Sequence, residues 1–263
     1  MTENEQLQYL LQYLLKENSA YSTLKIPDAP EERKRLLRSL MNMRPPAPAE
    51  QEFLAVQDAY LTGESLRKGI VSPDDLRPLE PGLRLWQGDI TTLRADAIVN
   101  AANSALLGCF TPCHNCIDNA IHSAAGVQLR LTCHNIMQRQ GGKEPAGRAK
   151  ITSAYNLPCR WVLHTVGPII SGTPTKEDRL LLSSCYRSCL ELADAHHLQN
   201  IAFCCISTGE YHFPREEAAR IAVRTVKEYR RETGSNIEVI FNVFQNRDYD
   251  IYLSLLGKHT AAE

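Results

Sequence analysis

Apolar positions in the first part of the chain recur at helical spacing. Leucine occupies positions 7, 10, 11, 14 and 15, and a second apolar set follows the charged segment PEERKR before a proline-rich stop near residue 45. A third stretch with the same spacing follows residue 50. This spacing predicts three amphipathic helices. We therefore expect residues 1–75 to form a helical N-terminal extension that either packs on the main domain or docks a partner.

The pattern changes near residue 83, where short β-rich runs begin to alternate with helix-period stretches. The runs are GLRLWQGDI, AIVNAAN, AKITSAYNL, WVLHTVGP, NIAFCCIST and IEVIFNVF. The helical stretches are IDNAIHSAAGVQLRLTCHNIM, RLLLSSCYRSCLELADAHH and REEAARIAVRTVKEYRRE, with Pro214 expected at the first helical position of the last one. Runs that are apolar on both faces belong in a covered sheet. Residues 76–263 are therefore predicted to form a three-layer α/β/α domain with a mixed, mostly parallel sheet.

Composition and charge narrow the classes of partner. The 263 residues are 43% hydrophobic and 22% charged, which allows a large core without disulfides. The 29 basic and 30 acidic residues give a net charge of -1, which argues against a general nucleic-acid binder. The first residues, MTENEQLQYL, lack the features of a secretory signal, and no apolar run approaches the length of a membrane span. With nine cysteines, the chain is expected in the reducing cytoplasm with free thiols.

Polar residues follow three of the predicted strands, where parallel α/β sheets bind their ligands. They are QGDIT at 87–91, NAAN at 100–103 and STGEY at 207–211. Backbone N–H groups of the last segment precede a helix and could hold phosphate. Residues of the same types also serve in turns and helix caps, so this pattern alone does not establish a ligand-binding site.

Cysteine and histidine gather in one segment, GCFTPCHNCID at 108–118. Cys109, Cys113, His114 and Cys116 place four soft or borderline metal ligands within a proline-containing loop, which core packing does not explain. A closed structural zinc site would use all four, whereas a catalytic site would use three and keep one position open. Adjacent side chains rarely point the same way, so Cys109, His114 and Cys116 form the better trio. Both arrangements remain open, and iron or cobalt could replace zinc.

Asp118 follows the cysteine cluster at the start of a helical pattern. A carboxylate there could simply meet the helix dipole. His122 lies four residues on and shares its helix face, so the pair could also handle a proton or orient water beside a metal. The remaining histidines considered have no such context and are expected to be structural or solvated: His134, His164, His196 and His197.

Taken in order, these motifs resemble a macrodomain. The resemblance rests on QGDIT, IVNAANSAL, CIDNAIHSAAG, GRAKITSAYNL, WVLHTVGP and ISTGEYHFP, and covers residues 83–257. The closest group is the zinc-containing macrodomains of microbes, which occur with sirtuins of class M and a lipoyl-carrier protein and also carry a helical N-terminal extension. Usual hydrolytic macrodomains have a run of three glycines before the Val-Asp pair. Here PCHNC precedes Ile117 and Asp118, which fits the zinc group.

The resemblance implies a pocket for ADP-ribose. Asp89 and Ile90 would contact the adenine, which Phe244 would flank, and Asn103 would hold the distal ribose. The segment implied to wrap the diphosphate consists of Ser207, Thr208, Gly209, Glu210 and Tyr211. Asp118 matches the carboxylate that hydrolytic members place near the scissile bond. The implied catalytic residues are therefore Asp118, Asn103 and His122.

The activity implied is zinc-dependent hydrolysis of mono-ADP-ribose from protein side chains, with acidic residues as the expected attachment sites. One Zn²⁺ on Cys109, His114 and Cys116 would polarise ribose oxygens or water, and Asp118 would orient or deprotonate the water. The expected partner is an ADP-ribosylated protein, such as a lipoyl-carrier protein modified by a class M sirtuin, with neither nucleic acid nor membrane involved. The alternatives are a non-catalytic ADP-ribose reader with structural zinc, and a deacetylase or phosphatase of free ADP-ribose derivatives.

Overall fold

The computed structural model describes residues 1–21 and 23–257. Its main domain is built on one seven-stranded sheet with the order β1-β2-β7-β6-β3-β5-β4. The strands are β1 Pro78–Glu80, β2 Leu83–Gln87, β3 Ala97–Ala101, β4 Ala149–Ser153, β5 Trp161–Thr165, β6 Asn200–Phe203 and β7 Glu238–Val243. The outer pairs β1–β2 and β4–β5 are antiparallel, and the pairs between them are parallel. The mixed, mostly parallel sheet predicted from the sequence is therefore confirmed.

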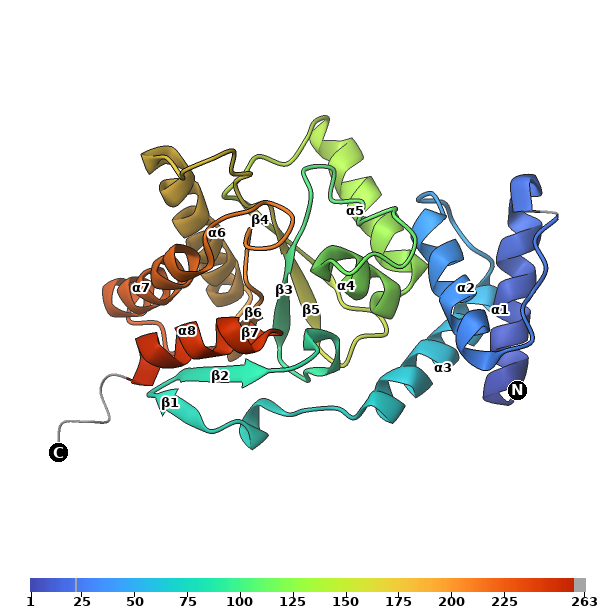
Figure 1. The fold of residues 1–263 in the computed structure, drawn as a ribbon, viewed down its shortest axis with the longest axis horizontal. Helices are drawn as coiled ribbons and strands as arrows, with labels where there is room; N and C mark the ends of the chain where they lie inside the picture. Colours follow the sequence, from blue (N-terminus) through green and yellow to red (C-terminus); the bar gives the residue numbers. More distant parts are fainter. Residues whose placement is uncertain (22, 258–263) are drawn as a thin grey trace.

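Helices cover both faces of this sheet (Figure 1). They are α4 Ile117–Ala125, α5 Val127–Gln140, α6 Lys176–Ala195, α7 Arg215–Thr233 and α8 Asn246–Leu256. In Figure 1, α4 and α5 lie on one side of the central strands and α6, α7 and α8 on the other. The strands between them are almost entirely buried, because each presents apolar side chains to both helical layers.

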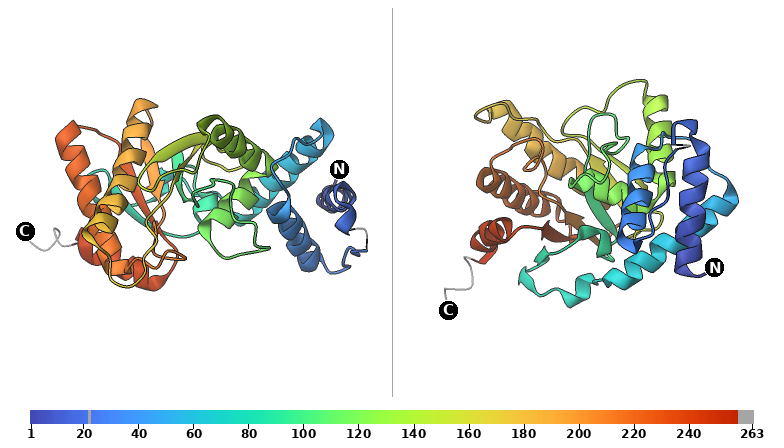
Figure 2. Two further views of the ribbon diagram at one scale, coloured as in Figure 1. Left: turned by 90° about the horizontal axis from the view of Figure 1, so that it is seen from above. Right: turned by 45° about the vertical axis from the view of Figure 1, so that its right-hand side comes forward.

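The N-terminal residues form a small helical cluster at one end of the molecule, as two further views show (Figure 2). It consists of α1 Glu3–Glu17, α2 Pro30–Met43 and α3 Gln51–Lys68. Buried leucines from α1 and α2 pack with Phe53 and Tyr60 of α3, and Val127 of α5 joins this second core. The three helices follow the predicted spacing, and α2 and α3 both contact α4. Whether residues 1–75 act as a separate domain remains a prediction.

Two local predictions need correction. The stretch from 117 to 137 was expected as one helix, but Gly126 separates α4 from α5 with a φ of 98°. A Cβ at residue 126 would lie 2.7 Å from Nε2 of Gln57, so glycine at this position also lets α3 pack closely against the break. Pro214 was expected at the first helical position, but it caps α7, which begins at Arg215.

Among the described residues, no helix is both long and apolar enough to cross a membrane. None of the nine cysteines forms a disulfide. The parallel strands β2, β3, β5, β6 and β7 bring their carboxyl ends to one edge of the sheet, which is where the predicted functional residues lie.

Candidate functional site

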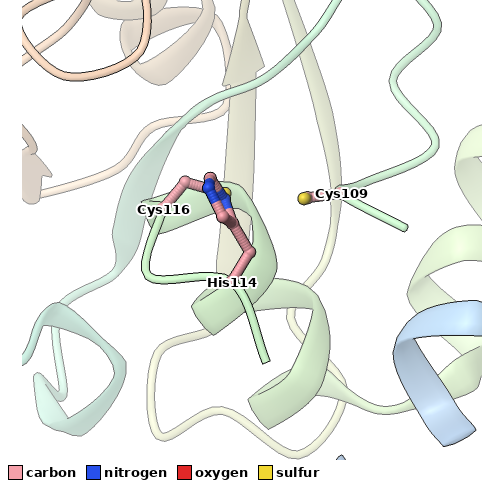
Figure 3. Close-up of side chains that lie close together, drawn as sticks. All are labelled: Cys109, His114 and Cys116. Carbon is pink, nitrogen blue, oxygen red and sulfur yellow. The ribbon is translucent and has the colours of Figure 1, made fainter. Parts of the chain in front are cut away.

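Cys109, His114 and Cys116 come together just before α4. One ligand atom from each lies within 4.8 Å of the others, and all three side chains are half-buried. Figure 3 shows the Cys109 sulfur facing His114 and Cys116 from the opposite side. Cys116 is also the N-cap of α4, where its sulfur accepts a hydrogen bond from the backbone N–H of Asn119. The loop thus presents two sulfurs and an imidazole at the start of the helix that carries Asp118.

The chemistry of this trio fits zinc. Nδ1 of His114 is buried with no hydrogen-bond partner among the described residues, so it is free to bind a cation. Burial, followed by the proximity of Cys109, raises the pKa of Cys116 to about 12, so that a bound cation would displace its proton. Two thiolates and one imidazole are ligands that zinc accepts in tetrahedral sites.

Cys113 lies outside this trio. Its sulfur is 3.2 Å from Oγ of Ser39 and 3.4 Å from the carbonyl oxygen of Arg35, both on α2. Its φ of 52° turns the loop between Thr111 and His114. The structure therefore favours the three-residue arrangement of the two that the sequence left open.

Asp118 is buried and held by two side-chain amides. Asn100 donates to its Oδ1 at 2.8 Å, and Asn103 donates to its Oδ2 at 3.2 Å. Burial raises the pKa of Asp118 to about 6, even though both amides and the charge of Arg130 favour the carboxylate. A carboxyl group in this range can exchange a proton near neutral pH.

His122 lies one helical turn beyond Asp118. Its Nε2 is 3.5 Å from Oδ1 of Asp118, and the ring is almost completely buried. Burial lowers the pKa of His122 well below its usual value, and His164 and Arg130 lower it further, so the imidazole is neutral. A Cβ on Gly108 would lie 2.7 Å from this ring, and Gly108 has a φ of 76°, so glycine suits the position.

His164, for which the sequence offered no context, lies behind Asn100. Its Nδ1 is 3.2 Å from Nδ2 of Asn100, and its Nε2 is 2.9 Å from Oγ1 of Thr152. Burial lowers the pKa of His164 to about 4. The imidazole is thus a neutral, structural part of the network that orients Asp118.

The loop at 207–211 has the features of an anion-binding turn. Within the described part of the chain, the backbone N–H groups of Gly209, Glu210 and Tyr211 donate to no acceptor. The loop is closed by hydrogen bonds from Phe213 N–H to the Ser207 carbonyl and from Ile170 N–H to the Tyr211 carbonyl. Ser207 is buried with a φ of 64°. Free N–H groups in such a turn form a cradle for phosphate oxygens.

Glu210 also connects this loop to the cysteine loop. Its Oε1 lies 3.8 Å from Nε2 of His114, while Nδ1 of the same ring is the unpartnered nitrogen. A carboxylate on the distal nitrogen of a metal-binding histidine commonly fixes the ring orientation. This contact sets the predicted diphosphate loop beside the predicted metal site.

The residues predicted to bind adenine lie at the same edge of the sheet. Asp89 caps the short helix Ile90–Thr92, accepting hydrogen bonds from Thr91 and from Lys68 of α3. Burial raises the pKa of Asp89, but the Thr91 bonds and the Lys68 charge bring it below its usual value. Ile90 is buried, whereas Phe244, just after β7, is 75% exposed. Hydrogen bonds from Gly88 to Val243 and from Gln87 to the Phe244 carbonyl join the two segments.

Three residues around the cysteine loop were not identified from the sequence: Arg38, Asn119 and Arg130. All three hydrogen-bond to backbone carbonyls or side chains of segment 107–119. Arg38 is separated from that segment by about seventy residues of chain. Of the three, Asn119 alone lies within a motif that the sequence singled out, CIDNAIHSAAG.

Comparison with known proteins relates the chain to several named hydrolases. The Macro domain family matches residues 99–222. A protein-ADP-ribose hydrolase of Treponema medium is 52% identical over 98% of this chain and 100% of its own length. A protein of the same name from Staphylococcus aureus is 50% identical over 94% of this chain and 93% of its own length.

The chain is also similar in structure to solved macrodomains. A mutant macrodomain of Oceanobacillus iheyensis with ADPR superposes with a TM-score of 0.62 at 38% identity, covering 70% of this chain and 96% of that one. A Trypanosoma brucei macrodomain in complex with ADP-ribose gives a TM-score of 0.66 at 30% identity, covering 88% of this chain and 97% of the other.

Proposed function

The chain belongs to the macrodomain family, and from that membership we propose that it is a zinc-dependent hydrolase releasing ADP-ribose from mono-ADP-ribosylated protein side chains. The activity is that named for relatives about 50% identical over nearly the whole chain. The observation that carries the proposal is the position of Asp118: a buried carboxyl group, held by two amides, at the helix that begins with the Cys109–His114–Cys116 loop.

In this proposal the chain's own residues bind and orient the substrate. The free N–H groups at 209–211 hold the diphosphate, while Asp89, Ile90 and Phe244 enclose the adenine. Asn103 holds the distal ribose, and its amide stays in contact with Asp118. Loss of such positioning costs on the order of 10²-fold in rate.

Asp118 then orients the attacking water and accepts its proton. The hydroxyl bonds to the carbon of the ribose–protein link, and the protein carboxylate leaves with the electron pair of the broken bond. Cys109, His114 and Cys116 would hold a zinc ion beside this reaction, and the bound ion would supply Lewis-acid polarisation. His122, buried and neutral, lies beside the Asp118 carboxyl group and contributes no charge.

We propose acidic side chains as the attachment sites and the cytoplasm as the compartment, since the nine free thiols fit a reducing environment. The resemblance to the zinc-containing macrodomains makes a lipoyl-carrier protein modified by a class M sirtuin the first substrate to test.

The decisive experiment measures free ADP-ribose released from a protein that is mono-ADP-ribosylated on an acidic residue, with and without a zinc chelator. Release that the chelator abolishes and added zinc restores supports the full proposal. Release unaffected by complete removal of zinc would leave a hydrolase in which zinc has no part. If no linkage were cleaved while ADP-ribose still bound, the protein would be a reader.

A further inference from the structure

Arg38 of α2 reaches the cysteine loop from the N-terminal helices. Its Nη2 donates to the backbone carbonyl of His114 at 2.9 Å and to Oδ1 of Asn119 at 2.7 Å. Its Nε is 3.2 Å from the same Oδ1. The guanidinium thus contacts the loop and the first turn of α4 together, with two of its nitrogens directed at Asn119.

Asn119 links Arg38 to the rest of the loop through further hydrogen bonds. Arg38 occupies its side-chain oxygen, which turns Nδ2 toward the carbonyls of Thr111 at 2.9 Å and Cys109 at 3.5 Å. The backbone N–H of Asn119 donates to the Cys116 sulfur at 3.4 Å. Arg38 and Asn119 together therefore contact the backbone or side chain of all three members of the trio.

Helix α2 is itself fixed against this loop. Buried Arg130 donates to the carbonyls of Met41 and Asn42 at the end of α2 and to the carbonyl of Leu107 before the loop. Its guanidinium also lies 4.2 Å from the ring centroid of Phe110, inside the loop. The side chain of Asn42 accepts from the Cys113 N–H at 2.9 Å and donates to Ser123 of α4 at 2.8 Å. The position of α2 relative to the loop is therefore well determined.

We propose that Arg38 is a positioning residue for the metal site, so that α2 of the N-terminal extension forms part of the functional centre. Segment 108–116 has no regular secondary structure, so outside contacts must hold its three ligand atoms together. Removing outer contacts of this kind typically costs 10–100-fold in metal affinity or activity. The inference rests on the proposed function for its effect on turnover, but its effect on zinc binding can be measured separately.

The test compares Arg38→Met with Arg35→Met in the full-length protein. Arg35 lies on the same helix with an exposed side chain that makes no hydrogen bond or ion pair within the described residues, so it is a matched control. Zinc affinity is measured by chelator competition with the metal alone, ADP-ribose affinity by calorimetry, and folding by the unfolding midpoint of the metal-free protein. Arg38→Met should weaken zinc binding 10–100-fold. Its kcat should fall on the order of 10²-fold, with KM and ADP-ribose affinity close to wild type.

Arg38→Lys provides a second variant that keeps the charge and the apolar stem. The lysine side chain is shorter and lacks the second nitrogen that Arg38 directs at Asn119, so the zinc affinity of this variant should lie between those of Arg38→Met and wild type. Wild-type zinc affinity in both Arg38 variants would overturn the inference, whatever their turnover. If wild-type protein cleaved no linkage but Arg38→Met still released zinc, the proposed function would fail and the role of Arg38 at the metal site would stand.

Discussion

The side-chain amide of Asn100 donates a 2.8 Å hydrogen bond to Asp118, joining the interior strand β3 to the helix that follows the cysteine loop. The same amide nitrogen lies 3.2 Å from His164 of β5. A carboxyl group on the first turn of a helix is thereby fixed relative to two strands of the sheet. The position of Asp118 is therefore set by the buried strands of the sheet as well as by the cysteine loop beside it.

Replacing Asp118 with asparagine should stop turnover while preserving the binding of ADP-ribose. The amide keeps the size of the carboxyl group but cannot accept a proton from water, so kcat should fall by about 10²–10⁴-fold. The measurement pairs ADP-ribose release with calorimetry on ADP-ribose. Asp74→Asn, at an exposed position in the chain before β1, is the matched control. Full turnover in Asp118→Asn would remove this residue from the chemistry.

Metal content should separate Cys113 from the other two loop cysteines. Cys109→Ser should lose most of its bound zinc, because serine oxygen replaces one of the three proposed protein ligands. Cys113→Ser should keep one zinc per chain and near-normal turnover, since its sulfur faces Ser39 and Arg35. Zinc is measured by elemental analysis of protein purified without added metal. Equal loss of zinc from both variants would indicate a closed four-ligand site.

Sequence patterns predicted most of this architecture because the strands are apolar on both faces and the helices keep their period. They missed Arg38 and Arg130, whose roles depend on α2 and α5 lying against the loop. No local spacing carries such information, because the contacts join segments that are far apart in the chain. The break at Gly126 was missed for a similar reason: the apolar period continues through it, and the space it leaves is filled by Gln57 of α3.

Acid should destabilise the metal-free protein, in part through His164. Burial lowers its pKa to about 4 in the folded state, whereas the unfolded chain takes up the proton near the usual value of 6.5. The stabilisation from the neutral imidazole is therefore complete above pH 6.5 and is lost as the pH falls toward 4, by up to about 3 kcal/mol. Urea unfolding at pH 7, 6 and 5, with chelator present throughout, measures this change without a contribution from zinc release.

The contribution of His164 is isolated by comparing wild type with His164→Asn. This variant should be less stable at every pH, but its free energy of unfolding should fall less steeply below pH 6.5, by up to about 1.4 kcal/mol per pH unit. His197→Asn controls for loss of a histidine at an exposed position whose φ of 55° asparagine tolerates. Identical slopes in wild type and His164→Asn would show that protonation of this imidazole does not contribute to the loss of stability in acid.

Gly167, just after β5, should control the shape of the predicted diphosphate loop. A Cβ at this position would overlap Oγ of Ser207 and lie 3.0 Å from a methyl group of Ile206, so Gly167→Ala must shift the Ser207 side chain and crowd the loop. Overpacking of this kind costs about 1–3 kcal/mol. A loss of 1.4 kcal/mol in binding free energy corresponds to a tenfold loss of affinity. We expect ADP-ribose to bind about tenfold more weakly or worse, as measured by calorimetry.

A second substitution shows whether the clash itself is responsible. Ser207 has a φ of 64°, and its buried hydroxyl group has no hydrogen-bond partner among the described residues. Ser207→Gly should therefore be tolerated, since the proposal assigns phosphate binding to backbone N–H groups. The double variant Gly167→Ala with Ser207→Gly should regain most of the lost affinity, because the side chain that the new methyl strikes is gone. Gly142→Ala, whose added Cβ has no described atom within 4 Å, should bind as wild type. Failure of the double variant to recover would mean that Gly167 acts on binding by another route than the position of Ser207.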